Sequence, residues 1–314
     1  MGTDLNDSSA RSTIAVLVCT YRRPPMLTRL LDQVTAIQAA SPDLDVSFVV
    51  VDDDPASSAA PAVEAYRARV DALRVDYVEL GSQDISKARN AAIERGLQRA
   101  DWLAFIDDDC SPELDWLHEM ARIQRCTDAD IVTSGVRYFV QPGSPPWLAE
   151  QGFLDLINVY ADASVPAWGC MANVMLRRSW FAEHPDVRFD DTFGKTGGED
   201  MTFLRLAIDR GANMRWAAGA HVAEELPPAR ANMRYLLYRR YWLGNNNVMI
   251  HLRNRWMTRA RMAVRVARKW VCWVAALVVD PMRRRPFHGR QRAAVAAEIW
   301  GMTLGLLGIE SGHL

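Results

Sequence analysis

Residues 102–117 read WLAFIDDDCSPELDWL, and this short stretch combines three structural signals. Its first five residues, Trp102–Ile106, are apolar without a break, which is typical of a strand buried on both faces. The triplet Asp107–Asp109 ends that strand abruptly. Pro112 then opens a helix with Trp116 among its apolar positions. The stretch therefore predicts a strand–turn–helix unit with a polar cluster where the strand ends.

The same unit recurs earlier in the chain. The apolar runs 14–19 and 46–51 each end at polar residues, and residues 73–80 alternate as a strand does. Apolar residues recur at helical spacing over 27–37 and 85–97. Strands that alternate with helices form a sheet covered on both faces, so the sequence predicts an α/β fold. In such sheets ligands bind beyond the carboxyl ends of the strands, where the polar clusters stand.

The composition is that of a globular protein. Of 314 residues, 49% are hydrophobic and 24% are charged, which excludes wholesale disorder and fits one large domain with an appendage. The five cysteines are scattered without a C-x-x-C pair, so neither a disulfide framework nor a structural zinc site is expected. The polar start, MGTDLNDSSARS, lacks the apolar core of a signal peptide, and we expect a cytoplasmic protein.

The net charge of −1 conceals a division of charge along the chain. Residues 230–314 hold 16 of the 37 basic residues but only three of the 38 acidic ones, which makes this part +13 and residues 1–229 −14. We therefore predict a domain over 1–229 and a basic helical extension over 230–314, with the boundary near Pro227-Pro228. Such a cationic extension is expected to bind an anionic partner, either lipid headgroups or nucleic acid.

The apolar runs of the extension are too short to cross a membrane. Trp270–Val279 is ten residues without charge, about half of a bilayer crossing, and Trp300–Ile309 is interrupted by three glycines. Arginines beside tryptophan and aliphatic residues suit helices among headgroups, so residues 255–314 are predicted to attach to an anionic membrane surface. A solvated hairpin packed on the domain is the alternative. Nucleic acid is not expected as a partner, because no aromatic stacking platform accompanies the arginines.

Two acidic clusters follow predicted strands. Asp107, Asp108 and Asp109 repel one another, and a bound cation relieves that repulsion. Oxygen ligands at a strand end suit Mg²⁺ or Mn²⁺, which bind substrate phosphates; a solvated turn is the alternative. Asp52–Asp54 could hold a second metal or accept hydrogen bonds from a base or ribose. The absence of G-x-G-x-x-G and P-loop motifs argues against dinucleotide and P-loop enzymes.

A third polar cluster, Gly197-Gly198-Glu199-Asp200, precedes a predicted helix. Adjacent glycines let a ligand approach the backbone closely. A carboxylate beside that space can take a proton from an incoming hydroxyl. Acidic residues also stand at helix starts merely because they complement the helix dipole, so this alternative stays open.

Five motifs over residues 14–211 resemble, in this order, the family-2 glycosyltransferases with the GT-A fold: VLVCTYRRP, FVVVDDD, ISKARNAAI, WLAFIDDDCSPELDWL and FDDTFGKTGGEDMTFLRLAIDRG. The next segment, RANMRYLLYRRYWLGN at 230–245, is similar to bacterial exopolysaccharide transferases of the succinoglycan type. The resemblance implies a Rossmann-like, mixed but mostly parallel sheet flanked by helices. It places nucleotide-sugar binding over about 12–125 and the acceptor side over about 126–229.

The resemblance also implies roles for single residues on the donor side. Thr20 and Tyr21 would lie against the nucleotide base, and Arg22, where the family commonly has Asn, would lie near the phosphates. Asp53 would contact the base, with Asp52 beside it. The other donor-side residues are Arg89, Asn90, Asp107, Asp108, Gly197 and Gly198.

For the reaction itself, the resemblance implies a metal site and a base. Asp109 and Asp107 would hold Mg²⁺ or Mn²⁺, and His221 stands where some relatives have a third ligand. Asp200 corresponds to the catalytic base and Glu199 to a neighbour that orients the substrate. The implied reaction is a single displacement with inversion at the anomeric carbon.

The implied donor is a UDP-hexose, and the implied acceptor is a lipid-linked oligosaccharide in exopolysaccharide or cell-surface polysaccharide synthesis. Such an enzyme would work at the inner face of the cell membrane. Two alternatives remain. A nucleotidyltransferase also uses acidic metal ligands, although it usually has a glycine-rich phosphate loop that is absent here. A non-catalytic saccharide-binding or scaffold relative would have no reason to keep repelling carboxylates.

Overall fold

The computed structural model describes residues 12–69, 75–151, 153–154, 160–194, 196–282 and 289–312. The chain forms two compact units, each assembled from three segments. Unit 1 consists of Met1–Val136, Val159–Arg188 and Ala207–Val222. Unit 2 consists of Arg137–Asn158, Phe189–Leu206 and Ala223–Leu314.

Unit 1 is built on a seven-stranded sheet with the order β3-β2-β1-β4-β8-β6-β9. The strands are β1 Ser12–Thr20, β2 Leu44–Asp52, β3 Val75–Glu79, β4 Trp102–Ile106, β6 Ile131–Thr133, β8 Asn173–Arg177 and β9 Met214–Trp216. Only β8 runs antiparallel to its neighbours β4 and β6; the other neighbouring strands pair in parallel. The predicted α/β class with a mixed, mostly parallel sheet is confirmed.

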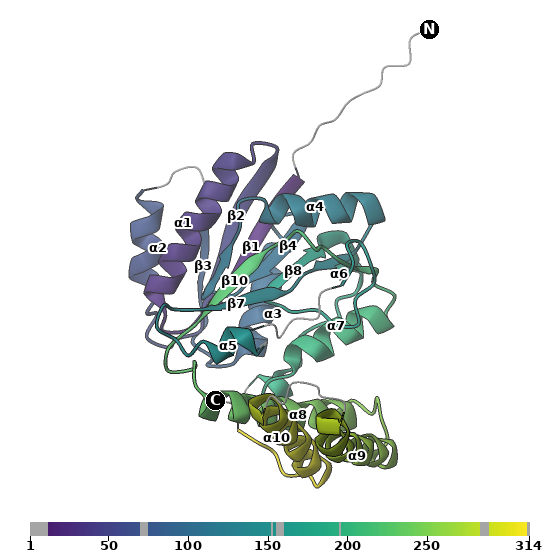
Figure 1. Ribbon diagram of the computed structural model, residues 1–314. Helices are drawn as coiled ribbons and strands as arrows, with labels where there is room; N and C mark the ends of the chain where they lie inside the picture. Colours follow the sequence, from purple (N-terminus) through teal and green to yellow (C-terminus); the bar gives the residue numbers. More distant parts are fainter. Residues whose placement is uncertain are drawn as a thin grey trace. The chain divides into compact units, whose positions relative to one another are not determined.

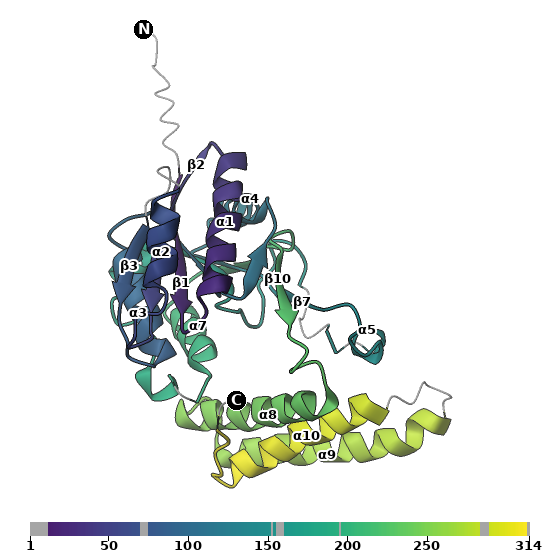
Figure 2. The ribbon, with the colours of Figure 1, turned by 90° about the vertical axis from the view of Figure 1, so that its left-hand side faces the viewer.

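Helices cover both faces of this sheet. They are α1 Pro24–Ala40, α2 Ala60–Arg67, α3 Ile85–Gly96, α4 Trp116–Thr127 and α6 Arg178–Glu183. Figures 1 and 2 show α1 and α3 on opposite faces, as right-handed crossovers in opposite directions require. The predicted helical spacing is confirmed in α1, whose buried residues are Leu27, Leu30, Leu31, Val34 and Ile37.

The helix after the aspartates begins later than Pro112, where the sequence predicted it. Cys110–Pro112 forms the short strand β5, and α4 starts at Trp116. The Glu113 N–H donates to the carbonyl of His221 (3.1 Å), which keeps the chain extended before the helix. Proline suits an extended edge segment as well as a helix start, and here Pro112 is the last residue of strand β5.

One polar side chain is built into the core of unit 1. Asn173 is fully buried at the start of β8. Its Oδ1 accepts from Trp116 Nε1 (2.9 Å), and its Nδ2 donates to the carbonyls of Gly135 and Ala220 (both 2.9 Å). Because these bonds satisfy the buried amide, Asn173 joins α4 to the segments after β6 and β9 without leaving a buried polar group unpaired.

Unit 2 is mainly helical. Its elements are β7 Val136–Val140, α5 Trp147–Glu150, the 3₁₀ turn Asp191–Phe193, the start of α7 Glu199–Asp209, β10 Val222–Leu226, α8 Met233–Arg253, α9 Arg259–Met282 and α10 Gly289–Leu306. Strands β7 and β10 are neighbours in a small sheet. A Cβ at Gly244 of α8 would lie 2.0 Å from the carbonyl oxygen of Glu298, and one at Gly301 of α10 would lie 1.9 Å from that of Tyr241. Glycine at both positions therefore lets the backbones of α8 and α10 touch.

Helix α9 has apolar residues on two faces. Met262 and Val266 are buried in a cluster with residues of α8 and α10, and Figure 2 shows α9 and α10 side by side. On the other face Val264, Val271 and Val278, seven residues apart, are exposed. Among the described residues, no helix combines the length and the hydropathy that a bilayer span requires.

Candidate functional site

The carboxyl ends of three neighbouring strands bring the predicted donor-side residues of unit 1 to one edge of the sheet. Thr20 ends β1 and pairs in register with Asp52, the last residue of β2. The aspartate triplet follows β4, the other neighbour of β1. Thr20 Oγ1 donates to Asp108 Oδ2 (2.7 Å), which joins the end of β1 directly to the triplet.

The three aspartates of the triplet differ in surroundings. The side chain of Asp107 is 44% exposed and lies 3.7 Å from the guanidinium of buried Arg89. Asp108 is buried, and although Thr20 and Arg23 favour its charged form, burial raises its pKa to about 6. Asp109 is partly exposed. Asp107 and Asp109 are thus two partly exposed carboxylates just after a strand, and carboxylate oxygens are the ligands that Mg²⁺ and Mn²⁺ prefer.

Asp52 and Asp53 mainly organise their own loops. The Oδ2 atom of buried Asp52 accepts from Ala59 N (2.7 Å) and Tyr77 OH (2.8 Å). Asp53 accepts from the backbone N–H groups of residues 82–84 and from the Ser82 hydroxyl. Both carboxylates are therefore fixed by several hydrogen bonds, and the contact of Asp53 with a nucleotide base stays a prediction.

The two arginines after Tyr21 point to different partners. Arg22 has a φ of +57°, in the left-handed region. Its Nε lies 3.2 Å from Asp54 Oδ1, and its guanidinium lies 4.9 Å from the centre of the Tyr21 ring. Arg23 instead reaches the triplet, with Nη1 3.1 Å from Asp108 Oδ1 and 2.9 Å from Asp109 Oδ2. Sequence reasoning named Arg22 and missed Arg23, although both stand in the same motif.

Helix α3 supplies the remaining donor-side residues. Asp84 caps its start by accepting from the N–H groups of Ser86 (3.0 Å) and Lys87 (3.2 Å). Arg89, one turn into the helix, is buried and faces Asp107, while Asn90 next to it is partly exposed. His221 also belongs to unit 1 and lies just before β10, where its carbonyl accepts from Glu113.

In unit 2 the predicted glycine pair packs on α8. Gly197 and Gly198 have φ angles of +78° and +102°, which favour glycine. A Cβ at Gly197 would lie 2.5 Å from the Trp242 ring, and one at Gly198 would lie 2.3 Å from Ile250 Cδ1. The glycines therefore admit the protein's own helix, a reason for them that the sequence did not indicate.

The two acidic residues after the glycines begin α7. Glu199 is buried and Asp200 is partly exposed. At a helix N-terminus the backbone dipole stabilises the charged form of a carboxylate. The sharp turn at the glycines thus sets where Asp200 projects.

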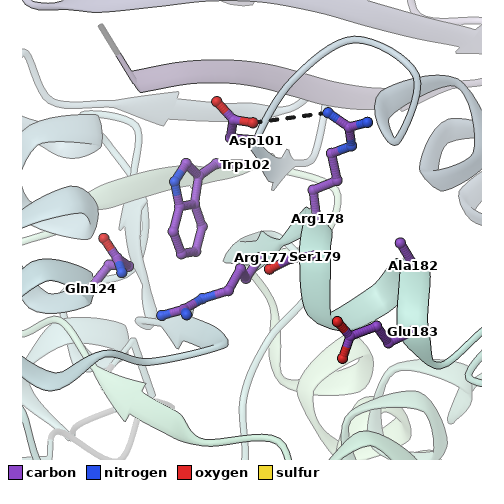
Figure 3. Close-up of a pocket in the computed structure, with 8 residues that line it drawn as sticks. All are labelled: Asp101, Trp102, Gln124, Arg177, Arg178, Ser179, Ala182 and Glu183. Carbon is purple, nitrogen blue, oxygen red and sulfur yellow. Dashed lines mark ion pairs between the residues drawn. The ribbon is translucent and has the colours of Figure 1, made fainter. Parts of the chain in front are cut away.

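A separate pocket of about 550 Å³ lies at the opposite edge of the main sheet (Figure 3). Trp102, which begins β4, and Arg177, which ends the antiparallel β8, both line it. Arg178 and Asp101 form an ion pair across it (3.9 Å). None of the predicted site residues lines this pocket.

Comparison with known proteins identifies the family. The family model described as glycosyl transferase family 2 matches residues 15–185. The chain belongs to glycosyltransferase family 2. It is 30% identical over 303 residues to the succinoglycan biosynthesis protein ExoM of Rhizobium meliloti (strain 1021), a match that spans 95% of this chain and 94% of ExoM. The predicted glycosyltransferase activity is confirmed at this level.

Solved structures share the fold. Residues 1–349 of S. aureus TarS, in complex with UDP-GlcNAc, match with a TM-score of 0.52 and 18% identity over 74% of this chain and 67% of that one. The mannosyltransferase PcManGT from Pyrobaculum calidifontis, in complex with GDP-Man and Mn²⁺, matches with a TM-score of 0.63 and 16% identity over 95% and 88%. This likeness confirms the predicted GT-A fold.

Proposed function

We propose that this glycosyltransferase transfers a hexose, with inversion, from a nucleoside diphosphate sugar to a hydroxyl group of a lipid-linked oligosaccharide. The aspartate triplet at the end of β4, with arginines on two of its sides, is the observation that carries the proposal. In a chain of this family, such a cluster is best explained as the site of a diphosphate and its metal.

The donor is held from three strand ends and one helix. Thr20 and Tyr21 face the base, Asp52 and Asp53 fix the loops around it, and Arg22 lies toward the phosphates. The other donor-side residues of unit 1 are Arg89, Asn90, Asp107 and Asp108. Asp109 and Asp107, with His221 as a third ligand, would hold Mg²⁺ or Mn²⁺, which neutralises charge on the departing diphosphate.

The chemistry needs one base and no covalent intermediate. The acceptor hydroxyl oxygen forms a bond to the anomeric carbon as the bond from that carbon to the diphosphate oxygen breaks. Asp200 takes the hydroxyl proton, and Glu199 orients the acceptor. Arginine side chains stabilise the negative charge that develops on the leaving diphosphate.

We assign UDP as the nucleotide and a polyprenyl-type lipid as the acceptor's carrier. TarS was solved with UDP-GlcNAc and PcManGT with GDP-Man, so relatives of this fold differ in nucleotide. The likeness to ExoM, a succinoglycan biosynthesis protein, supports an acceptor built in exopolysaccharide synthesis. Such an acceptor is held at the membrane, so the enzyme must reach the bilayer surface.

The outer face of α9 is the part of the chain that suits this surface, and it supports a peripheral location at the inner face of the cell membrane. Val264, Val271 and Val278 are exposed there, and Arg261 and Arg268 are exposed among them. Apolar side chains flanked by arginines fit the boundary between acyl chains and anionic headgroups. Each cation near such a surface contributes about 1 kcal/mol.

Donor binding is tested by thermal melting with UDP-, GDP- and dTDP-sugars, each with and without Mn²⁺. A ligand that binds only the folded protein raises its melting temperature, so one nucleotide class should produce a metal-dependent rise. We expect that class to be UDP. The absence of a shift with every nucleotide would contradict the proposal and favour a non-catalytic role.

A further inference from the structure

Arg23 contacts the carboxylate of Asp109, which is also an expected ligand of the metal. The Nη1 atom of Arg23 lies 3.1 Å from Asp108 Oδ1 and 2.9 Å from Asp109 Oδ2, so one nitrogen bridges two members of the triplet. Asp109 is also the residue expected to ligate the metal. A monovalent guanidinium therefore lies at the carboxylate that the divalent cation needs.

The two partners of Arg23 differ in how easily they can release it. The Asp108 side chain is 5% exposed. If Arg23 left it, the Thr20 hydroxyl would be the one side chain among the described residues that still donates to this buried charge. The Asp109 side chain is 20% exposed, so a metal with its waters can replace the arginine there. Arg23 can thus stay on Asp108 while it leaves Asp109.

Arg23 also has donors to spare. Within the described residues both of its side-chain hydrogen bonds use Nη1, and its Nε and Nη2 make none. Its backbone is fixed at the start of α1, where its carbonyl accepts from Met26 N (3.0 Å) and Leu27 N (3.1 Å). A guanidinium on a fixed backbone, with free N–H groups in a fork, is suited to bind a phosphate oxygen.

We propose that Arg23 occupies the metal's place at Asp109 while the donor site is empty. When the donor binds, its diphosphate attracts the Arg23 guanidinium away from Asp109. Metal and nucleotide then bind cooperatively, because each removes a contact that opposes the other. By linkage, each raises the affinity for the other by the same factor. The inference rests on the proposed function, since it takes the arriving anion to be a nucleoside diphosphate.

The test is calorimetric titration with MnCl₂ alone and then in the presence of UDP. Without nucleotide, we expect Arg23→Gln to bind Mn²⁺ about fivefold more tightly than the wild type, the equivalent of losing one part-exposed competing ion pair. UDP should tighten Mn²⁺ binding in both proteins, because the diphosphate itself can ligate the metal. The gain should be smaller in Arg23→Gln, in which no arginine has to leave Asp109. Arg29→Gln is the matched control: Arg29 donates to the Asp109 carbonyl (3.2 Å) and not to a carboxylate. Its Mn²⁺ affinity should change less than twofold.

Unchanged or weaker Mn²⁺ binding by a folded Arg23→Gln variant overturns the inference, as does a lack of Mn²⁺ binding by both proteins. If that variant does not fold, Arg23→Lys decides. It keeps the charge, so Mn²⁺ affinity without nucleotide should stay at the wild-type level. It should lose part of the gain from UDP, because an ammonium group lacks the forked N–H groups with which a guanidinium binds Asp108 and a diphosphate oxygen through separate nitrogens; an undiminished gain overturns the inference. A wild type that binds Mn²⁺ but neither UDP nor GDP contradicts the proposed function instead, and the competition is still measured by Mn²⁺ alone.

Discussion

The base is the single side chain on which the proposed chemistry depends most. Asp200 is the second residue of α7 and is partly exposed. We expect Asp200→Asn to lower turnover by about 10²–10⁴-fold, because an amide cannot take the proton of the acceptor hydroxyl. Turnover is measured with a labelled donor, and donor affinity by calorimetry should stay within about twofold of the wild type.

Asp209→Asn makes the same chemical change at the other end of α7 and serves as the control. It should leave turnover near the wild-type rate. If Asp200→Asn kept more than about a tenth of wild-type turnover, the base would have to be a different residue.

Single side chains also show which parts of the candidate site can be predicted from the sequence. The position of the aspartate triplet at a strand end was predictable, because the continuous apolar run before it identifies a buried strand. Arg23 was not, because two adjacent arginines look alike in a sequence. Which of them turns toward the triplet depends on the φ of +57° at Arg22, and no sequence pattern predicts an arginine in that conformation.

Among turns, the glycine pair before α7 makes the clearest prediction. A Cβ at Gly198 meets both a φ of +102° and Ile250, with Cδ1 at 2.3 Å and Cγ1 at 2.7 Å. We expect Gly198→Ala to destabilise the protein by about 2–4 kcal/mol and to lower turnover, because the turn that aims Asp200 must move. Denaturant unfolding and the labelled-donor assay measure the two effects.

Gly211 separates the two causes of the expected destabilisation, which are the strain of a positive φ and the clash with Ile250. Its φ is +95°, yet nothing lies within 4 Å of a Cβ there, so Gly211→Ala tests the backbone strain alone and should cost about 1 kcal/mol. Ile250→Val removes Cδ1, the closest atom. It should cost about 1 kcal/mol in the wild type but less, or nothing, in Gly198→Ala. Equal costs in both backgrounds would show that the clash is not the cause.

Secondary structure was predicted well where one signal dominates. Continuous apolar runs located β1, β2 and β4, because strands buried on both faces need them. The start of α4 was wrong by four residues, since a hydrogen bond to His221 keeps the chain extended after Pro112. That bond joins residues more than a hundred positions apart, and local patterns do not report such contacts.

For the whole chain, the charge distribution predicted a basic extension, but not which other segments form a compact unit with it. Unit 2 adds two segments from the middle of the chain, Arg137–Asn158 and Phe189–Leu206, to the helices after residue 222. The second of these carries the Gly197–Asp200 motif. The predicted base and the basic helices thus belong to one compact unit, which a division by net charge cannot detect.

The basic helices lead to the last prediction, which concerns how the enzyme meets its acceptor. Val271 is 68% exposed on the outer face of α9, and Val165 of unit 1 is 67% exposed. We expect Val271→Glu to reduce binding to vesicles containing anionic phosphatidylglycerol by about tenfold or more, because a carboxylate both loses apolar burial and repels the headgroups. Val165→Glu makes the same change at an equally exposed position and should bind as the wild type does. Co-sedimentation at low and high salt measures both, and binding should weaken as salt screens the arginines. Equal binding by the two variants would mean that the outer face of α9 does not meet the bilayer.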